Sequence, residues 1–338
     1  MIELPVMDLS NLADILKQYP NYRSRQIKKA LFLDLIEDWM DITTLPFDLR
    51  KKLNEECRLS IKGSFFESHD KSAIKAAITL KDNIRIESVL MKSRDGRNTV
   101  CVSSQAGCSL NCSFCATGRL GFKRNLEMFE IIEQVLFFAR LLKKENKKIT
   151  NIVFMGMGEP FLNYDNVLNT IKLLNEKDGF NLGARHFSIS TVGIPGGIKK
   201  FSNENLQVNL AISLHAPSDD LRSKIIPANK KYPINAIISC VDEYIKKTNR
   251  RVMFEYIMIK DFNDSVECAK KLSVLMKKPL YFINLITYNP TGKTLKPSKG
   301  ERIKIFKEIL EKEGIAVTQR FRFGEGLDAA CGQLVYKE

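Results

Sequence analysis

Histidine is scarce in this sequence, and long apolar runs are absent. The 338 residues include three histidines, His69, His186 and His215, which leaves few imidazole ligands for a metal site. No apolar run reaches the roughly eighteen residues that a membrane-spanning helix needs, so we expect no membrane association. The first residues, MIELPVMDLSNLADIL, lack a basic segment followed by an apolar one. We therefore expect no secretory signal and a cytoplasmic protein whose thiols stay reduced.

The eight cysteines also lack the spacings of the common closed metal sites. A structural zinc ion takes four ligands, usually two close pairs or cysteines with histidines, and no second cysteine pair lies near residues 108–115. The ferredoxin run C-x2-C-x2-C-x3-C-P is absent as well. In a reducing compartment, cysteines serve as metal ligands, catalytic groups or core residues more often than as disulfides. Cys57, Cys240 and Cys268 fall in helical patterns, and we expect them to fill the core.

Acidic residues are fewer than basic ones. Lysine and arginine number 53 and aspartate and glutamate 39, which gives a formal net charge of +14. This excess favours a polyanionic partner, with nucleic acid the leading candidate. A diffusely basic surface is the alternative.

The order of apolar patterns predicts an α/β fold preceded by a small helical section. Up to about residue 70 the chain has the pattern of short amphipathic helices, and we take residues 1–72 as an N-terminal accessory domain. Residues 73–98 predict an antiparallel β linker, with the turn signals KDN and RDGRN. From 99 to 290, strand-like runs beginning near residues 99, 149, 186, 207, 251 and 280 alternate with helical ones. This alternation predicts parallel βαβ units in a barrel or an open part-barrel, with residues 291–338 as a C-terminal extension that holds a seventh run.

Half of the cysteines lie in CVSSQAGCSLNCSFCATG, residues 101–118, where Cys108, Cys112 and Cys115 have the spacing C-x3-C-x2-C. Three thiolates on a four-iron cluster leave one iron open, which a catalytic cluster needs and an electron carrier avoids. S-adenosylmethionine can bind that iron, and an electron from the cluster can cleave it to a 5′-deoxyadenosyl radical. We therefore expect a [4Fe–4S] cluster and S-adenosylmethionine. A zinc ion and a chance grouping are the alternatives.

Further unusual residues follow the expected strand ends, where barrels of parallel strands place their catalytic groups. Gly158 and Glu159 in MGMGEP follow the second strand. A glycine lets the backbone approach a ligand closely, and the carboxylate can accept a hydrogen bond from the ammonium of S-adenosylmethionine. Later strands end at Ser190, at Ser213 with His215, and at Asn289. We expect these residues to converge on one mouth of the barrel.

The cysteine motif, GMGEP, AISLHAP and the tail DAACGQL, present in this order, resemble the RlmN/Cfr family of radical-SAM RNA methyltransferases. The resemblance runs from YRSRQIKKALF, residues 22–32, to the C-terminus. It implies a partial (β/α)6 radical-SAM barrel with a helical N-terminal domain and a C-terminal extension. The positions that match the family's cofactor contacts are Gly158, Glu159, Ser190, Ser213, Leu214, His215 and Asn289.

The resemblance also implies a mechanism. Cys331 would receive a methyl group from one S-adenosylmethionine, and a second, cleaved at the cluster, would activate that methyl group to attack an adenine ring. Cys101 would close a disulfide with Cys331 and release the methylated base, and Glu87 would accept a proton. Without the family, Cys101 is a core thiol and Glu87 a solvated strand residue.

The implied substrates are C2 of adenosine 2503 in 23S rRNA and of adenosine 37 in tRNA. A resistance branch of the family methylates C8 of the same rRNA adenosine, and Pro160 resembles the C2 branch. Gly326 and Leu327 depart from the family's tail, whereas Asp328 and Cys331 match it. A non-catalytic, metal-stabilised RNA-binding protein is the alternative from another class. We also expect a reductant protein such as flavodoxin or ferredoxin as partner, and a monomer.

The basic excess fits an RNA substrate. An adenine in folded RNA must be flipped out before a buried site can reach its ring, and lysine and arginine would contact the phosphates. The candidates are Arg119, Lys123, Arg124, Arg320 and Arg322. The helical N-terminal section is a candidate RNA-docking module.

Overall fold

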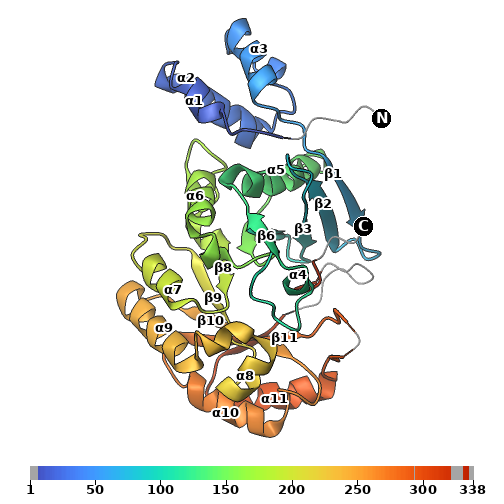
Figure 1. The fold of residues 1–338 in the computed structure, drawn as a ribbon, viewed down its shortest axis with the longest axis vertical. Coiled ribbons are helices and arrows are strands. Elements are labelled where there is room, and N and C mark those ends of the chain that lie inside the picture. The colour runs from blue at the N-terminus through green and yellow to red at the C-terminus, as the bar shows by residue number, and fades with distance from the viewer. Residues whose placement is uncertain (1–6, 293, 321–329, 335–338) are drawn as a thin grey trace.

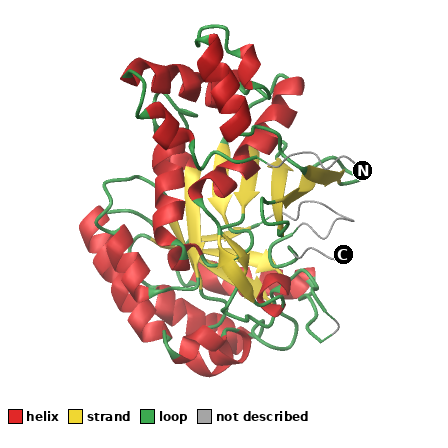
Figure 2. Ribbon diagram, turned by 45° about the horizontal axis from the view of Figure 1, so that its top comes forward, coloured by secondary structure: helices red, strands yellow, loops and turns green. Residues whose placement is uncertain are grey.

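The computed structural model describes residues 7–292, 294–320 and 330–334 (Figure 1). A ten-stranded sheet forms its centre, and helices pack around the outside (Figure 2). Arg322 and the tail positions Gly326, Leu327 and Asp328 fall outside the described residues. Within the described ranges, none of the helices has the length and apolar character needed to cross a membrane.

The first four strands form an antiparallel meander, and the rest run parallel. β1 (Gly63–Glu67), β2 (Ala73–Thr79), β3 (Arg85–Lys92) and β4 (Asn98–Val102) pair antiparallel in that order. β4 then pairs in parallel with β7 (Asn151–Phe154), followed by β8 (Phe187–Thr191), β9 (Asn209–Ser213), β10 (Val252–Met258), β11 (Tyr281–Thr287) and β12 (Val317–Gln319). Among the described residues, β1 and β12 are the edges of the sheet, so the barrel is open. The predicted meander and βα alternation are confirmed, and the boundary predicted after residue 98 falls inside β4.

One strand lies where the sequence predicted helix. The helical pattern ends at Glu56, and β1 begins at Gly63. All five residues of β1 are exposed, so the segment lacks the alternation of buried and exposed residues that identifies most strands. Pairing with β2 holds it in place, and Phe65 packs edge-on against Phe137, with 6.2 Å between the ring centroids. The prediction of helices up to about residue 70 is therefore wrong after Glu56.

Short helices of the N-terminal section lie at one end of the molecule, next to α5 (Met128–Lys144) (Figure 1). They are α1 (Leu12–Leu16), α2 (Asn21–Lys29), a π-helix (Ala30–Asp34), a 3₁₀ turn (Trp39–Asp41) and α3 (Phe47–Glu56). Arg140 of α5 anchors the section, because its guanidinium donates to the carbonyls of Leu59 at 2.9 Å and Ile36 at 2.6 Å. One continuous apolar core joins the section to the sheet.

The connections between the parallel strands are helical, as the periodicity predicted. Besides α5 they include α6 (Tyr164–Asn175), α7 (Pro195–Phe201), α8 (Asp219–Ile225), α9 (Ile234–Thr248), α10 (Val266–Met276) and α11 (Gly300–Lys312). Their apolar sides pack against strand residues such as Ile152, Phe187 and Phe254, which are fully buried. This packing covers one face of the sheet.

The other face of the sheet carries polar side chains. Residues paired in register lie on the same face of a sheet. Cys101 of β4 pairs with Val153, Ser213 of β9 pairs with Glu255, and Glu255 pairs with Asn284. Strands of buried parallel sheets are usually apolar on both faces. Charged, thiol and hydroxyl side chains in the middle of this sheet therefore indicate a functional surface.

Candidate active site

The loop between β5 (Gln105–Gly107) and α4 (Ala116–Arg119) carries the three closely spaced cysteines. Cys108, Cys112 and Cys115 line one cavity at the C-terminal ends of the parallel strands. Burial raises the pKa of the Cys108 thiol to about 12. Burial, followed by the charges of Cys115 and Cys108, also raises the pKa of Cys112. Thiols such as Cys108 and Cys112 ionise only against a strong positive charge, which iron can supply.

The donor set fits a cluster with a polar ligand beside it. The described residues contain no group of three or more His, Cys, Asp or Glu placed to hold a single metal ion. A four-iron cluster does not need such a group, because each thiolate binds a different iron. Asn289, buried just beyond β11, has a side-chain oxygen without a hydrogen-bond partner among the described residues. Since buried polar atoms are nearly always satisfied, this oxygen is free for an N–H or O–H of a ligand.

The described end of the chain docks on the cysteine loop. The carbonyl of Gly332 accepts from the backbone N–H of Ala116 at 2.7 Å, and that of Leu334 accepts from the hydroxyl of Thr117 at 2.6 Å. These bonds bring Cys331 into the wall of the cavity that the loop cysteines line, although 217 residues separate Thr117 from Leu334. The remaining cysteines, Cys57, Cys240 and Cys268, pack in or against the core, as expected.

Arg320 lies against Cys331 and close enough to Cys101 for their charges to interact. Its guanidinium donates to the sulfur of Cys331 at 3.1 Å and contacts the sulfurs of Met155 and Met91. Burial raises the pKa of the Cys331 thiol, and Arg320 opposes that rise. Burial, followed by the charge of Cys331, raises the pKa of the Cys101 thiol to about 12. Both cysteines are free thiols, and Arg320, a predicted phosphate contact, instead directs its charge at Cys331.

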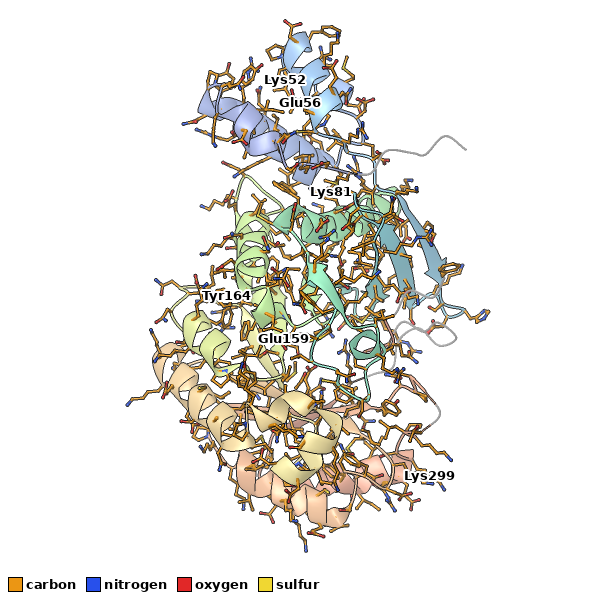
Figure 3. All side chains as sticks on the ribbon, viewed as in Figure 1. Lys52, Glu56, Lys81, Glu159, Tyr164 and Lys299 are labelled. Carbon is orange, nitrogen blue, oxygen red and sulfur yellow. The ribbon has the colours of Figure 1, made fainter. Side chains whose placement is uncertain are left out.

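The turn after β7 fixes Glu159 near the centre of the molecule (Figure 3). Gly158 has a φ of +100°, and a Cβ there would lie 2.5 Å from the Cβ of Gln105. The backbone N–H of Glu159 donates to the side-chain oxygen of Gln105 at 2.9 Å, and its carboxylate accepts from the amides of Phe161 and Val192 at 3.0 and 2.8 Å. Burial raises the pKa of Glu159 to about 7, and these amides oppose the rise. Thr191 also donates to this carboxylate, and of about four lone-pair sites one remains for a ligand.

Two serines from neighbouring strands share a buried carboxylate. The hydroxyl of Ser190 donates to Oε2 of Glu255 at 2.5 Å, and the hydroxyl of Ser213 lies 3.5 Å from the same oxygen. All three residues line the cavity with the cysteines. Sequence reasoning missed Glu255. The sequence held one signal for it, a single acidic residue inside the apolar run RVMFEYIM. An acid in such a run is expected to be buried, and a buried charge needs partners.

His215 is a buried, neutral histidine in the cavity wall. Burial, followed by the charge of Arg222, lowers its pKa to about 3. Its Nδ1 accepts from the amide of Ile257 at 3.2 Å, and its ring meets Phe114 edge-on with 4.9 Å between centroids. The ring therefore offers a ligand a flat, uncharged surface beside the cysteine loop. Of the described residues predicted to contact the cofactor, Leu214 and Asn289 do not line this cavity.

Glu87 is buried on β3, so the interpretation as a solvated strand residue is wrong. Its carboxylate forms an ion pair with Nζ of Lys75 at 2.9 Å. Its backbone N–H contacts the sulfur of Met157, in the turn after β7. Val89 of the same strand pairs with Cys101. Because residues two apart on a strand share a face, Glu87 borders the inner face that carries Cys101.

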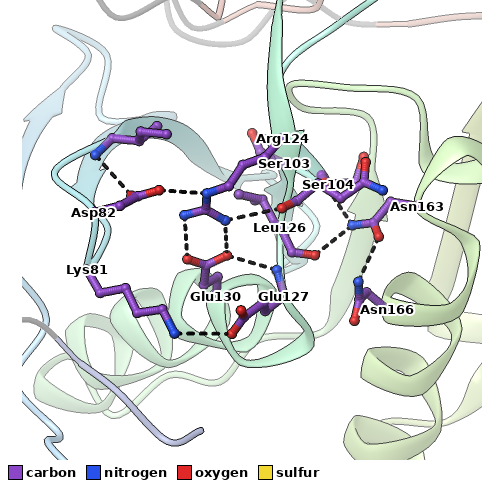
Figure 4. Close-up of polar contacts among 12 residues, drawn as sticks. Lys81, Asp82, Ser103, Ser104, Arg124, Leu126, Glu127, Glu130, Asn163 and Asn166 are labelled. Atoms are coloured by element: carbon purple, nitrogen blue, oxygen red, sulfur yellow. Dashed lines mark hydrogen bonds and ion pairs between the residues drawn. The ribbon is translucent and has the colours of Figure 1, made fainter.

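Arg124, another predicted phosphate contact, belongs to a salt-bridge network (Figure 4). It pairs with both oxygens of Glu130, at 2.7 and 2.8 Å, and with Asp82 at 2.7 Å. Lys81 adds an ion pair to Glu127 at 3.6 Å. The network ties the turn between β2 and β3 to the first turn of α5, beside the cysteine loop. Arg124 thus has a structural role in this part of the molecule.

Comparison with known proteins agrees with this geometry. Residues 102–272 match the model of the radical SAM superfamily. The chain is 44% identical to the "Probable dual-specificity RNA methyltransferase RlmN" of Dictyoglomus turgidum, over 97% of this chain and 94% of that protein. The chain belongs to the RlmN/Cfr family of radical SAM RNA methyltransferases. Within that family it is also 42% identical to the "Ribosomal RNA large subunit methyltransferase N" of Nitrosopumilus maritimus, over 94% and 93% of the two chains.

A solved structure extends the match to the fold. The radical SAM methyltransferase from Sphaerobacter thermophilus is 41% identical and superposes with a TM-score of 0.92, over 98% of this chain and 99% of that chain. The predicted radical-SAM fold class is confirmed. Membership of the superfamily also brings a [4Fe–4S] cluster and S-adenosylmethionine as cofactors, for which the loop thiols and the polar cavity wall are suited.

Proposed function

We propose that this member of the RlmN/Cfr family methylates C2 of adenosine 2503 in 23S rRNA and of adenosine 37 in tRNAs through an S-methylcysteine. The observation that carries the proposal is the position of Cys331, docked beside the cysteine loop with a guanidinium at its sulfur. A fourth thiol next to a three-cysteine cluster site is free to carry a group. The relatives are named as dual-specificity RNA methyltransferases, which supports two RNA substrates.

Cys108, Cys112 and Cys115 would hold one cluster with an open iron. Gly158, Glu159, Ser190, Ser213, Leu214, His215 and Asn289 would hold S-adenosylmethionine around it. When bound, these cofactors supply a carbon-centred radical, the chemistry needed at a ring carbon that is not nucleophilic. The proposal requires two molecules of S-adenosylmethionine per turnover. It also requires an electron donor, and a flavodoxin or ferredoxin is the expected partner.

Cys331 would carry the methyl group as it passes to RNA. S-methylation needs a thiolate, and Arg320 stabilises one because its N–H donates to the sulfur. After the carbon joins the adenine ring, Cys101 would form a disulfide with Cys331 and release the base. Glu87 would accept the ring proton, and Lys75 orients its carboxylate.

RNA would approach over the hairpin of β5 (Gln105–Gly107) and β6 (Phe122–Asn125). A hollow of about 790 Å³ lies there, lined by the β2–β3 turn and by Lys123 and Met157. Leu120 and Phe122 are 44% and 47% exposed, and exposed apolar side chains beside a lysine suit unstacked bases and phosphate. Arg119 is engaged with the carbonyl of Thr291, which makes Lys123 the stronger candidate for a phosphate contact.

Methylation at C8 is the second candidate reaction, and Pro160 favours C2. Methylation at C8 would keep the same cysteine chemistry, so the two differ only in how the adenine is presented. The monomeric state and the cytoplasmic location stay predictions.

Anaerobic reconstitution of the full chain tests the proposal. The wild type, Cys331→Ala and Cys101→Ala should each bind about four irons and cleave S-adenosylmethionine under reducing conditions. Cys331→Ala should lose methyl transfer to rRNA and tRNA, and Cys101→Ala should accumulate RNA crosslinked to Cys331. Cys268→Ala removes a buried thiol of the core and should retain transfer. Methyl transfer by Cys331→Ala, or no crosslinked species with Cys101→Ala, would contradict the proposed roles.

A further inference from the structure

Arg222 of α8 is completely buried and donates five hydrogen bonds. Nε donates to the carbonyl of Leu214 at 2.9 Å, Nη1 to Oδ1 of Asn229 at 2.8 Å and to the carbonyl of Tyr232 at 3.2 Å, and Nη2 to the carbonyls of Val192 at 2.6 Å and Ser213 at 3.1 Å. A guanidinium has five N–H groups, so each of them is satisfied. The side chain thereby ties together the ends of β8 and β9, where the cavity wall is built.

All five acceptors are uncharged, so the hydrogen bonds leave the positive charge of Arg222 unbalanced. The nearby carboxylate of Asp219 accepts instead from Nδ2 of Asn229 at 2.9 Å and from the amide of Ile234 at 2.8 Å. A buried charge is costly unless an opposite charge compensates it. The folded chain therefore places a cation at the cavity wall without an ion-pair partner among the described residues.

The cysteine loop is fastened beside Arg222. The amide of Ser113 donates to the carbonyl of Ile225 at 3.0 Å, which fastens the loop to the end of α8. Cys112 and Phe114 of the loop pack against the apolar cluster that contains Val192 and Ile225, and the carbonyl of Val192 accepts from Nη2 of Arg222. Burial lowers the pKa of Arg222 to about 10. An anionic cluster held by this loop would therefore lie close to the buried guanidinium.

We propose that Arg222 is a positioning residue whose buried cation is balanced by the anionic cluster at Cys108, Cys112 and Cys115, and that it raises the reduction potential of that cluster. Reduction adds one electron to the cluster core, with no bond formed or broken and no proton moved. The assembly of core and thiolates becomes more negative by one charge, and a neighbouring cation in a medium of low dielectric constant stabilises that form. The inference rests on the proposed function in requiring that the cluster binds here.

The test is a potentiometric titration of the reconstituted full chain, with dithionite as the electron donor and the reduced cluster followed by electron paramagnetic resonance. Arg222→Gln removes the charge, and Arg222→Lys keeps it while losing hydrogen bonds. We expect the equilibrium constant for reduction to fall about tenfold in Arg222→Gln, a shift of about 59 mV to more negative potential, and to stay near wild type in Arg222→Lys. Arg140→Gln is the matched control, because Arg140 is also buried but donates to Leu59 and Ile36 in the N-terminal section. It should lower thermal stability without moving the potential.

Asn229→Asp provides an independent variant if Arg222→Gln does not fold. It places a carboxylate of the same shape 2.8 Å from Nη1 of Arg222, which neutralises the cation and should also shift the potential negative. A wild-type reduction potential in Arg222→Gln overturns the proposal. If only Asn229→Asp folds, a wild-type reduction potential in that variant overturns it. Failure of the wild-type chain to bind any cluster would instead overturn the proposed function.

Discussion

The substitution Gly158→Ala examines the turn that is proposed to bind the cofactor. Gly158 has a φ of +100°, a backbone conformation that side chains rarely adopt. A Cβ at this position would lie 2.5 and 2.7 Å from Cβ and Cγ of Gln105 and 2.8 Å from its backbone nitrogen. Contacts this short force Gln105 to move. Its side-chain oxygen would then lose the hydrogen bond from the amide of Glu159.

The expected loss of stability has two parts. Backbone strain costs about 1–3 kcal/mol, and overpacking a buried site costs about 1–3 kcal/mol more. The free energy of unfolding should therefore fall by about 2–6 kcal/mol in Gly158→Ala. Gly96 supplies the matched control, because its φ is +86° and nothing lies within 4 Å of a Cβ there. Gly96→Ala should show only the strain, about 1–3 kcal/mol.

Urea unfolding followed by far-ultraviolet circular dichroism measures both variants. Equilibrium dialysis with S-adenosylmethionine on the reconstituted proteins measures the functional effect, which should be a loss of affinity in Gly158→Ala and none in Gly96→Ala. Equal destabilisation of the two variants would refute the close approach of Gly158 to Gln105. Unchanged affinity in Gly158→Ala would refute the part of this turn in binding.

Three further predictions concern buried acids and the proposed cluster ligands. Burial, followed by the charge of Glu130, raises the pKa of Glu133 well above 4.5. The folded state therefore keeps this proton to higher pH than the unfolded state, and stability falls as pH rises above 4.5. Near pH 7.5 the melting temperature of Glu133→Gln should lie above that of the wild type, and near pH 4 the two temperatures should coincide. The exposed control Glu308→Gln should not show this dependence on pH. A difference between Glu133→Gln and the wild type that stays the same at both pH values would contradict the prediction. Glu255→Ala removes the acceptor shared by Ser190 and Ser213. Because hydrogen bonds to a charged group contribute about 1.5–3 kcal/mol, the affinity for S-adenosylmethionine should fall at least tenfold. Calorimetry that shows wild-type affinity would contradict this prediction. Cys112→Ala should lose most iron on reconstitution while Cys57→Ala retains it, and retention of iron by Cys112→Ala would exclude Cys112 as a ligand.

The local parts of the candidate site could be predicted from sequence. Cys108, Cys112 and Cys115 lie close together in the chain, so their spacing alone limits what they can bind. Gly158 and Glu159 follow a strand whose apolar pattern is clear, and parallel strands bring their C-terminal ends to one edge. The position of Cys331 had no such signal. It depends on hydrogen bonds from Ala116 and Thr117 to the tail, and only the family resemblance pointed to it.

The missed and misread residues share a physical cause. A sequence does not show whether a charged side chain points outward or inward. Arg124 and Arg320 both counted as phosphate contacts, yet one pairs with Glu130 and Asp82 and the other faces Cys331. Arg222 sits in an ordinary helical pattern, and Glu255 stood out only as a single acid in an apolar run. The partners of both became visible only when distant strands were brought together. The edge strand β1 was missed because its stability comes from pairing with β2 and not from a buried face of its own.

Nucleoside mass spectrometry of RNA from cells that lack the protein tests the central claim most directly. We expect 2-methyladenosine to disappear from both 23S rRNA and tRNA, and we expect the wild-type gene to restore it while the Cys331→Ala gene does not. Unchanged 2-methyladenosine, or loss of 8-methyladenosine in its place, would contradict the proposed function.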